Sequence, residues 1–304
     1  MQAPLPPSDI DPELDAGPGA CVLSFNANDP SAAAGLAADV STIASVGVHA
    51  LPVVTGAYVR DTAETLEHHA FDDEVVAAQA RTILEDVPVQ AIKVGFVGSP
   101  ENLAAVGALA SDYAEATVIS YMPDLSWWDD SLAETYQEAC TELLLPQTSV
   151  LVGSHMTLTR WLLPDWSGDK PPSAREIAHA ASAFGVPYTL VTGIALPDQY
   201  IDNILAAPHA ALCSHKFERF DAHFVGAGET LSAALTALIA SGTELTDAVA
   251  EALAYLDQCL GNGFRPGMGH VLPDRMFWAQ PENEDDSASD DALSIDLPPN
   301  ATRH

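Results

Sequence analysis

Short β-like runs alternate with Ala-rich helical stretches along most of the chain, and this order constrains the fold more than any other feature. The run Cys21–Phe25 precedes a small-residue loop, a helical stretch at Leu36–Val46 and a second β-like run at His49–Thr55. A strand, a loop, a helix and a strand in this order form a βαβ unit. The repeated alternation predicts an α/β fold with a mostly parallel central sheet and helices on both faces.

The remaining elements are expected from the same periodicities. The expected strands are 65–69 (a short extra strand), 89–94, 117–120, 149–152 and 188–191, followed by a hairpin of 201–205 and 210–217. The expected helices are 71–85, 100–114, 132–144, 174–184, a helix within 224–240, and 245–260, before an apolar end segment at 271–278. Ligands bind at the carboxyl ends of strands in such sheets. We therefore expect the loops after residues 25, 94 and 225 to line one cleft.

Composition and charge limit the domain organisation and the partners. The 304 residues are 48% apolar, which suits one packed domain over residues 19–280. Residues 1–18 are predicted to be a disordered arm and residues 281–304 an acidic disordered tail. The formal net charge of −32 argues against nucleic acid or an anionic membrane as a partner.

Cysteine and histidine placement argues against disulfides and metal sites. The four cysteines are scattered without a CxxC pair, and the ten histidines lack the spacing of a zinc site. The first residues show no basic region followed by an apolar core, so we expect no signal peptide, and no apolar run approaches the roughly 20 residues that span a bilayer. We expect a cytoplasmic protein with reduced thiols and no metal-ligating residues of its own.

The stretch Phe224–Ala240 is the strongest candidate for chemistry. Gly226, Ala227 and Gly228 precede a long helical run, so backbone N–H groups and the helix dipole favour an anion there. Glu229 stands at the helix entrance, where it either caps the helix or takes a proton from a bound molecule. The alternative is a glycine-rich turn before a core helix, with Glu229 as a first-turn acid.

Two further places carry candidate binding residues. The loop that begins at Asn28, together with Asp39 one turn into the next helix, can place a carboxylate and small-residue backbone beside a ligand. The alternative is a capped turn with Asp29 or Ser31 as the cap. Lys93 lies in an apolar strand, so its ammonium either reaches the cleft or finds an ion-pair partner.

Three ordered motifs resemble one family. Asn28–Asp39 (NDPSAAAGLAAD) resembles the (S/T)DPSGGAGIQAD signature of the hydroxymethylpyrimidine/phosphomethylpyrimidine kinases of thiamine synthesis. Ile92–Gly95 looks like their KIG strand end, and Gly226–Leu235 resembles GTGCTLSAAL. The ending Gly263–Arg275 is similar to the proteobacterial branch. The resemblance runs in order from Cys21 to Trp278, nearly the whole predicted domain.

The resemblance implies a ribokinase-like fold in which ATP, with Mg²⁺, and a pyrimidine alcohol meet above the sheet. Gly226, Ala227 and Gly228 would form the anion hole, and Glu229, where the family has Cys or the superfamily Asp, would be the base. The implied substrate-binding residues are Asn28, Ala34, Asp39, Arg60 and Phe96, with Arg60 replacing a Gln or Glu and Phe96 a Met. Family members are often dimers, so a homodimer is possible.

The chain also departs from the family pattern. The TPN-x-x-E stretch linked to magnesium aligns with Val152–Thr157, which lacks the Asn and the Glu, and an acid is missing at Ser120–Met122. The Gly-Gly pair of the substrate loop is Ala32-Ala33. Two hypotheses follow: an ATP-dependent kinase for hydroxymethylpyrimidine or its monophosphate, or a catalytically degenerate paralogue that binds a small ligand or a protein.

Overall fold

One mixed sheet runs through the whole computed structural model, which describes residues 19–279. The predicted arm and the predicted acidic tail lie outside the described residues. The strands are β1 (Cys21–Asn28), β2 (His49–Arg60), β3 (Thr65–Ala70), β4 (Ala91–Val94), β5 (Thr117–Tyr121), β6 (Val150–Ser154), β7 (Tyr188–Ala195), β8 (Tyr200–Ala207) and β9 (Ala210–Glu218). Their order across the sheet is β3-β2-β1-β4-β5-β6-β7-β8-β9.

The centre of the sheet is parallel and its two edges are antiparallel. β1 pairs in parallel with β2 on one side and with β4 on the other, and the parallel pairing continues through β5 and β6 to β7. β3 returns antiparallel along β2, and β8 and β9 extend β7 as an antiparallel hairpin. Both the mostly parallel sheet and the hairpin confirm the sequence-based expectation.

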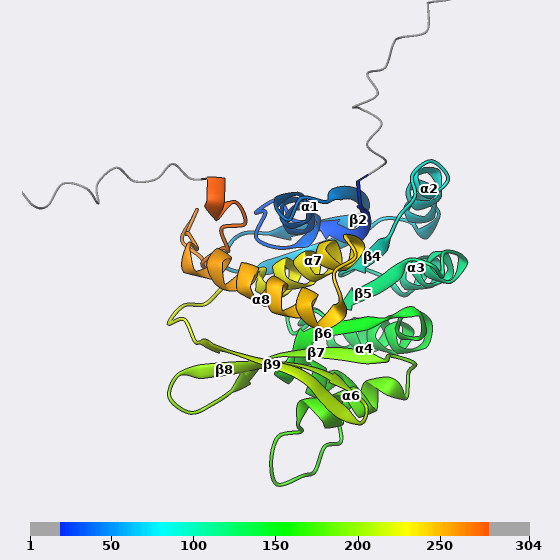
Figure 1. The fold of residues 1–304 in the computed structure, drawn as a ribbon. Helices are drawn as coiled ribbons and strands as arrows, with labels where there is room; N and C mark the ends of the chain where they lie inside the picture. The colour runs from blue at the N-terminus through cyan, green and yellow to red at the C-terminus, as the bar shows by residue number, and fades with distance from the viewer. Residues whose placement is uncertain (1–18, 280–304) are drawn as a thin grey trace, which may run out of the picture.

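Helices cover both faces of the sheet (Figure 1). The helices are α1 (Gly35–Ser45), α2 (Asp73–Leu84), α3 (Pro100–Asp112), α4 (Asp130–Ala139), α5 (His155–Leu162), α6 (Ala174–Ser182), α7 (Ala227–Ala240) and α8 (Leu245–Gly261). α1, α7 and α8 pack together on one face, with α7 against the central strands, and α2 to α6 follow one another across the other face. Among the described residues, no helix combines the length and apolar character needed to cross a membrane.

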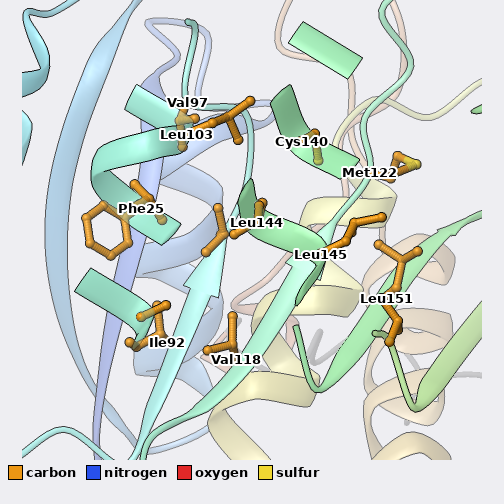
Figure 2. Close-up of a cluster of buried hydrophobic side chains, with 14 of the residues drawn as sticks. Phe25, Ile92, Val97, Leu103, Val118, Met122, Cys140, Leu144, Leu145 and Leu151 are labelled. Atoms are coloured by element: carbon orange, nitrogen blue, oxygen red, sulfur yellow. The ribbon is translucent and has the colours of Figure 1, made fainter. Parts of the chain in front are cut away.

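Two apolar cores lie on opposite faces of the sheet because neighbouring strand residues point to opposite sides. Leu23, Val118 and Leu151 are buried toward α2–α6, whereas their neighbours Val22, Ile119 and Val152 are buried toward α1, α7 and α8. Figure 2 shows part of the first core, where strand residues such as Ile92 and Val118 lie beside helical residues such as Leu144. Because both faces of the central strands are buried, their sequences are continuous apolar runs.

The structure differs from the expected elements in three places. β2 extends beyond the expected end at Thr55 to Arg60, because antiparallel pairing with β3 satisfies its backbone groups. The helix expected at 132–144 ends at Ala139, and a wider helical turn continues at Cys140–Leu144. The helix α5 was not expected, although the Ser154 side chain caps it by accepting from the N–H of Thr157.

Candidate functional site

A cavity of about 660 Å³ opens at the carboxyl ends of the central strands. It lies where β1, β2 and β5 end and where α7 begins. The residues on its wall are Ala34, Tyr58, Arg60, Ala63, Glu64, Thr65, Tyr121, Pro123, Asp124, Ser126, Trp127, His223, Phe224, Val225, Gly226, Glu229 and His270. The expected meeting of the loop after β1 with the Gly226 turn is therefore confirmed, whereas Gly95 and Gly98 do not line this cavity.

The turn before α7 lets its own backbone approach neighbouring groups closely. Gly226 is the helix N-cap at φ +83°, a left-handed conformation that glycine adopts without strain, and no side chain caps the helix. A Cβ on Gly226 would overlap with the carbonyl oxygen of Ala33 in the loop after β1. A Cβ on Gly228 would overlap with the ring of Tyr121. The N–H of Thr230 donates to the carbonyl oxygen of Gly226 at 2.9 Å and that of Glu229 bonds to its own carboxylate, so the N–H groups of Ala227 and Gly228 remain for a partner from the cavity.

Glu229 projects from the first turn of α7 onto the cavity wall and is half-buried. Burial raises the pKa of its carboxyl group above the ordinary value, while the positive charge of Lys93 opposes this shift. The pKa values of Tyr58 and Tyr121 are raised well above the usual value, first by burial and then by the negative charge of Glu229. Both phenols therefore stay neutral hydrogen-bond donors beside a carboxylate that can accept a proton.

Beneath the cavity lies a buried network centred on Asp39. Its Oδ1 is 2.7 Å from Nζ of Lys93, and its Oδ2 accepts from Ser24 Oγ at 2.8 Å and from Asn26 Nδ2 at 2.9 Å. The same Lys93 ammonium is 6.0 Å from the ring centroid of Tyr121. Of the alternatives for Lys93, the structure supports the ion pair. Asp39 holds the strands and α1 together behind the site and does not line the cavity.

The loop after β1 is organised by Asp29. Its carboxylate accepts from the backbone N–H and the hydroxyl of Ser31 at 2.8 and 2.7 Å, and from the N–H of Ala34 at 2.8 Å. Arg60 approaches the same carboxylate, with Nη1 at 3.6 Å from Oδ2. The alternative that Asp29 or Ser31 is the N-cap is wrong, because the N-cap of α1 is Ala34 and no side chain caps it. Asp29 instead holds the loop before the helix through these hydrogen bonds. Arg60 reaches the cavity wall as a paired cation.

An aromatic wall that the sequence did not reveal as a unit closes one side of the cavity. Trp127 lies edge-on to Tyr58 at a ring-centroid distance of 5.9 Å and to Phe96 at 5.8 Å. Phe96 is buried and stacks on Tyr58 at 5.8 Å. Tyr58 and Trp127 expose ring surface to the cavity, whereas Phe96 supports them from behind. These rings come from separate loops and strands, so neither spacing nor periodicity could group them.

The remaining predicted residues take different positions. Ala34, Arg60, Gly226 and Glu229 line the cavity, and Ala227 and Gly228 are half-buried beside it in the first turn of α7. Asn28 is exposed at the end of β1 and does not line the cavity. In the part of the chain that the structure describes, no group of three or more His, Cys, Asp or Glu side chains converges to hold a metal ion.

A family model, related sequences and solved structures all relate this chain to small-molecule kinases. The family model described as phosphomethylpyrimidine kinase matches residues 29–274. The hydroxymethylpyrimidine/phosphomethylpyrimidine kinase of Mycobacterium leprae is 28% identical, over 82% of this chain and 91% of that protein. The enzyme of the same name from Rhizobium meliloti is 28% identical, over 82% of this chain and 94% of that protein.

Solved structures confirm the ribokinase-like α/β fold. The pyridoxal kinase of Bacillus subtilis, in its ADP complex, has a TM-score of 0.77 at 21% identity and covers 86% of this chain and 98% of its own. The phosphomethylpyrimidine kinase of Clostridium difficile has a TM-score of 0.65 at 21% identity, covering 79% of this chain and 99% of its own. At this identity the likeness concerns the fold.

Proposed function

The chain belongs to the phosphomethylpyrimidine kinase family, and on this premise we propose that it transfers the γ-phosphoryl group of ATP to hydroxymethylpyrimidine or its monophosphate. The proposal is supported by relatives named for both substrates over most of the chain. The observation that carries it is that Glu229, the uncapped start of α7 and the loop ending at Ala34 meet on one cavity. Glu229 can act as a base, the start of α7 can bind an anion, and the loop brings its backbone close to a bound substrate.

The cavity suits a small aromatic alcohol. The rings of Tyr58 and Trp127 offer a flat apolar surface on which a pyrimidine can pack, and aromatic pairs contribute about 0.5–1.5 kcal/mol beyond area burial. Glu229 faces the same space, within reach of a hydroxymethyl group that lies against these rings. The acceptor is thus held by packing and presented to a carboxylate.

The chemical step uses few groups. Glu229 accepts the proton of the acceptor hydroxyl as its oxygen forms a bond to the γ-phosphorus, and the bond from that phosphorus to the β–γ bridging oxygen breaks. ADP leaves with the bridging oxygen, and hydroxymethylpyrimidine becomes a phosphomonoester. When the monophosphate is the acceptor, one of its phosphate oxygens forms the new bond to phosphorus and the product is a diphosphate. The N–H groups at Gly226, Ala227 and Gly228 donate to the oxygens of the group in transfer, because the helix start favours negative charge.

Magnesium enters this proposal as the counter-ion of ATP. Kinases hold Mg²⁺ through one or two carboxylates together with phosphate oxygens, and the bound ion neutralises phosphate charge. The cavity wall carries the carboxylates of Glu64, Asp124 and Glu229, and Asp124 already pairs with Arg160 at 3.2 Å. These residues do not form a preformed cage in the described part of the chain. The proposed step uses no ion held by the protein alone.

Turnover of purified wild type tests the proposal directly. ADP and phosphorylated product are measured with hydroxymethylpyrimidine, its monophosphate and pyridoxal as separate acceptors, with Mg-ATP. We expect acceptor-dependent ADP release with the pyrimidines that collapses in Glu229→Gln and persists in the control Glu251→Gln, which changes an exposed carboxyl group of α8 outside the cavity. No turnover with any pyrimidine would contradict the kinase proposal.

The degenerate paralogue is the second candidate, and the altered positions Ser120–Met122 and Val152–Thr157 are the observation that favours it. The segment Ser120–Met122 aligns with the family segment that carries an acid, and its Tyr121 lines the cavity wall without supplying a carboxylate. Calorimetric titration with Mg-ATP separates the candidates. Micromolar binding supports the kinase, whereas no heat at millimolar nucleotide together with no turnover supports the silent protein.

A further inference from the structure

Arg275 joins the loop after β1 to the start of α7, two segments that each contribute residues to the cavity wall, although it does not line the cavity itself. Its Nε donates to Thr230 Oγ1 at 2.9 Å, its Nη1 to the carbonyl oxygen of Ala32 at 3.0 Å, and its Nη2 to that of Ala33 at 2.6 Å. The residue is buried. Thr230 directly follows Glu229, and Ala33 directly precedes Ala34, so one guanidinium connects the phosphate side of the cavity with the acceptor side.

The loop that Arg275 holds is strained at one residue. Ala32 has φ +54°, a left-handed conformation that disfavours a side chain by about 1–2 kcal/mol. Its carbonyl oxygen accepts from Arg275, and its N–H donates to the carbonyl oxygen of Asp29 at 3.1 Å. These bonds keep the loop in a shape that its alanines do not favour by themselves.

The close approach at Gly226 makes the arrangement sensitive to small shifts. The carbonyl oxygen of Ala33 occupies the space that a Cβ of Gly226 would need, so the backbones of the loop and the turn are in direct contact. Arg275 binds that same carbonyl oxygen. Any movement of the guanidinium therefore changes the distance between the two segments.

The main chain of Arg275 is itself anchored from two helices. Its carbonyl oxygen accepts from Ser45 Oγ at the end of α1, at 2.7 Å, and from the hydroxyl of Tyr255 in α8, at 2.8 Å. A side chain fixed at its base and at three donor atoms has little freedom to rearrange. Such rigidity is what a site needs when a displacement of about 1 Å can reduce a rate about 100-fold.

We propose that Arg275 is a positioning residue that sets the distance between the acceptor loop and the phosphate-binding turn and couples the binding of the two substrates. This inference rests on the proposed function. Its signature is a lower kcat with a smaller change in KM, and ATP hydrolysis that is no longer matched by product. Water then replaces the misplaced acceptor hydroxyl.

The test compares wild type with Arg275→Met, and with Arg265→Met as a control that removes a cation from the same segment. We expect Arg275→Met to lower kcat about 100-fold, to change KM for hydroxymethylpyrimidine less than threefold, and to yield less than one phosphorylated product per ADP. Low-millimolar guanidinium chloride should restore part of kcat in Arg275→Met alone. Arg265→Met should match wild type in all these measurements.

A second pair of variants keeps the test decisive if Arg275→Met does not fold. Thr230→Val removes the acceptor of Nε while keeping the shape, and Thr230→Ser keeps the hydroxyl. We expect Thr230→Val to reproduce the loss of kcat and of the product-to-ADP ratio, and Thr230→Ser to retain both. Equal values for wild type, Thr230→Val and a folded Arg275→Met would overturn the role of Arg275.

The effect of nucleotide on the affinity for hydroxymethylpyrimidine shows whether this inference or the proposed function has failed. The dissociation constant of hydroxymethylpyrimidine is measured with and without saturating AMP-PCP, a non-hydrolysable ATP analogue. We expect a coupling factor of about five or more in wild type and near one in Thr230→Val and Arg275→Met. A factor of one in wild type overturns the coupling by Arg275, whereas absent turnover with coupling intact contradicts only the kinase proposal.

Discussion

Nζ of Lys93 lies 2.7 Å from Oδ1 of Asp39, and neither side chain is exposed to solvent. The pair lies beneath the cavity, where the positive charge of Lys93 also counters the effect of burial on Glu229. A buried ion pair adds little net stability, but the loss of one partner leaves an uncompensated charge. Lys93 and Asp39 therefore matter to the fold and to the ionisation of the candidate base.

The ion pair predicts a strong coupling between its two positions. Lys93→Met should lower the free energy of unfolding by about 3–5 kcal/mol, because Asp39 is left charged and buried. The double variant Lys93→Met/Asp39→Asn should recover part of this loss, since the amide oxygen still accepts from Ser24 and Asn26. Urea unfolding followed by circular dichroism measures each value. A loss below about 1 kcal/mol in Lys93→Met would contradict the prediction.

The raised pKa of Glu229 predicts where activity falls in acid. A base must be ionised, so a carboxyl group whose pKa lies above its usual value loses activity at a higher pH than an ordinary carboxylate does. We expect kcat to fall with an apparent pKa above 4.5 as the pH decreases. At pH values above that pKa, Glu229→Gln should lose about 100-fold or more of kcat, and its remaining activity should not show the fall in acid. A pH-independent kcat, or near-normal turnover by Glu229→Gln, would rule out this base.

Replacing each of two glycines that share a left-handed backbone conformation distinguishes the effect of backbone strain from the effect of a steric overlap. Gly226 and Gly242 have φ of +83° and +89°, but only at Gly226 does an added Cβ overlap with another residue. Gly242→Ala should lower the free energy of unfolding by about 1–2 kcal/mol and leave kcat unchanged. Gly226→Ala should displace the Ala33 carbonyl and reduce kcat at least about 100-fold. Equal effects of the two variants on kcat would argue against the close approach as the cause.

The aromatic wall predicts an effect on acceptor binding. Trp127→Leu removes the ring that lies edge-on to Tyr58, and the loss of about 1 kcal/mol of aromatic contact should raise KM for hydroxymethylpyrimidine about fivefold. The KM for ATP should change little, because the wall is proposed to hold only the acceptor. Trp166→Leu, in a surface groove beside α5, is the matched control and should leave both constants unchanged. An equal rise of both constants in Trp127→Leu would contradict the assignment.

His68 predicts a pH dependence of stability. Its Nε2 is buried without a hydrogen-bond partner, and burial, with a smaller effect of His69, lowers the pKa to about 4 from the ordinary 6.5. The unfolded chain binds this proton more readily, so the folded state loses stability as the pH falls below 6.5 toward 4. Between neutral and acidic pH, the unfolding free energy of wild type should therefore fall by about 1–3 kcal/mol more than that of His68→Gln. A difference that stays constant with pH would contradict this.

Local sequence patterns determined the architecture of this protein. The alternation of apolar runs and Ala-rich stretches predicted the parallel sheet and its two helical layers, because periodicity depends only on near neighbours in the chain. The glycines before α7 and the acid at its first turn likewise identified Gly226 and Glu229 as parts of the cavity wall. The eight-residue helix α5 was missed because a segment of this length carries little periodicity.

Only the tertiary structure decided which side chains act together. Lys93 and Asp39 are 54 positions apart, and Arg275 and Ala33 are 242 apart, yet each pair is in direct contact. Nothing in the sequence around Arg275 distinguishes a buried clamp from a surface cation, and nothing around Arg60 predicts its pairing with Asp29. Partners of buried charges are selected by the distances that the folded backbone creates, and those distances do not follow from spacing along the chain.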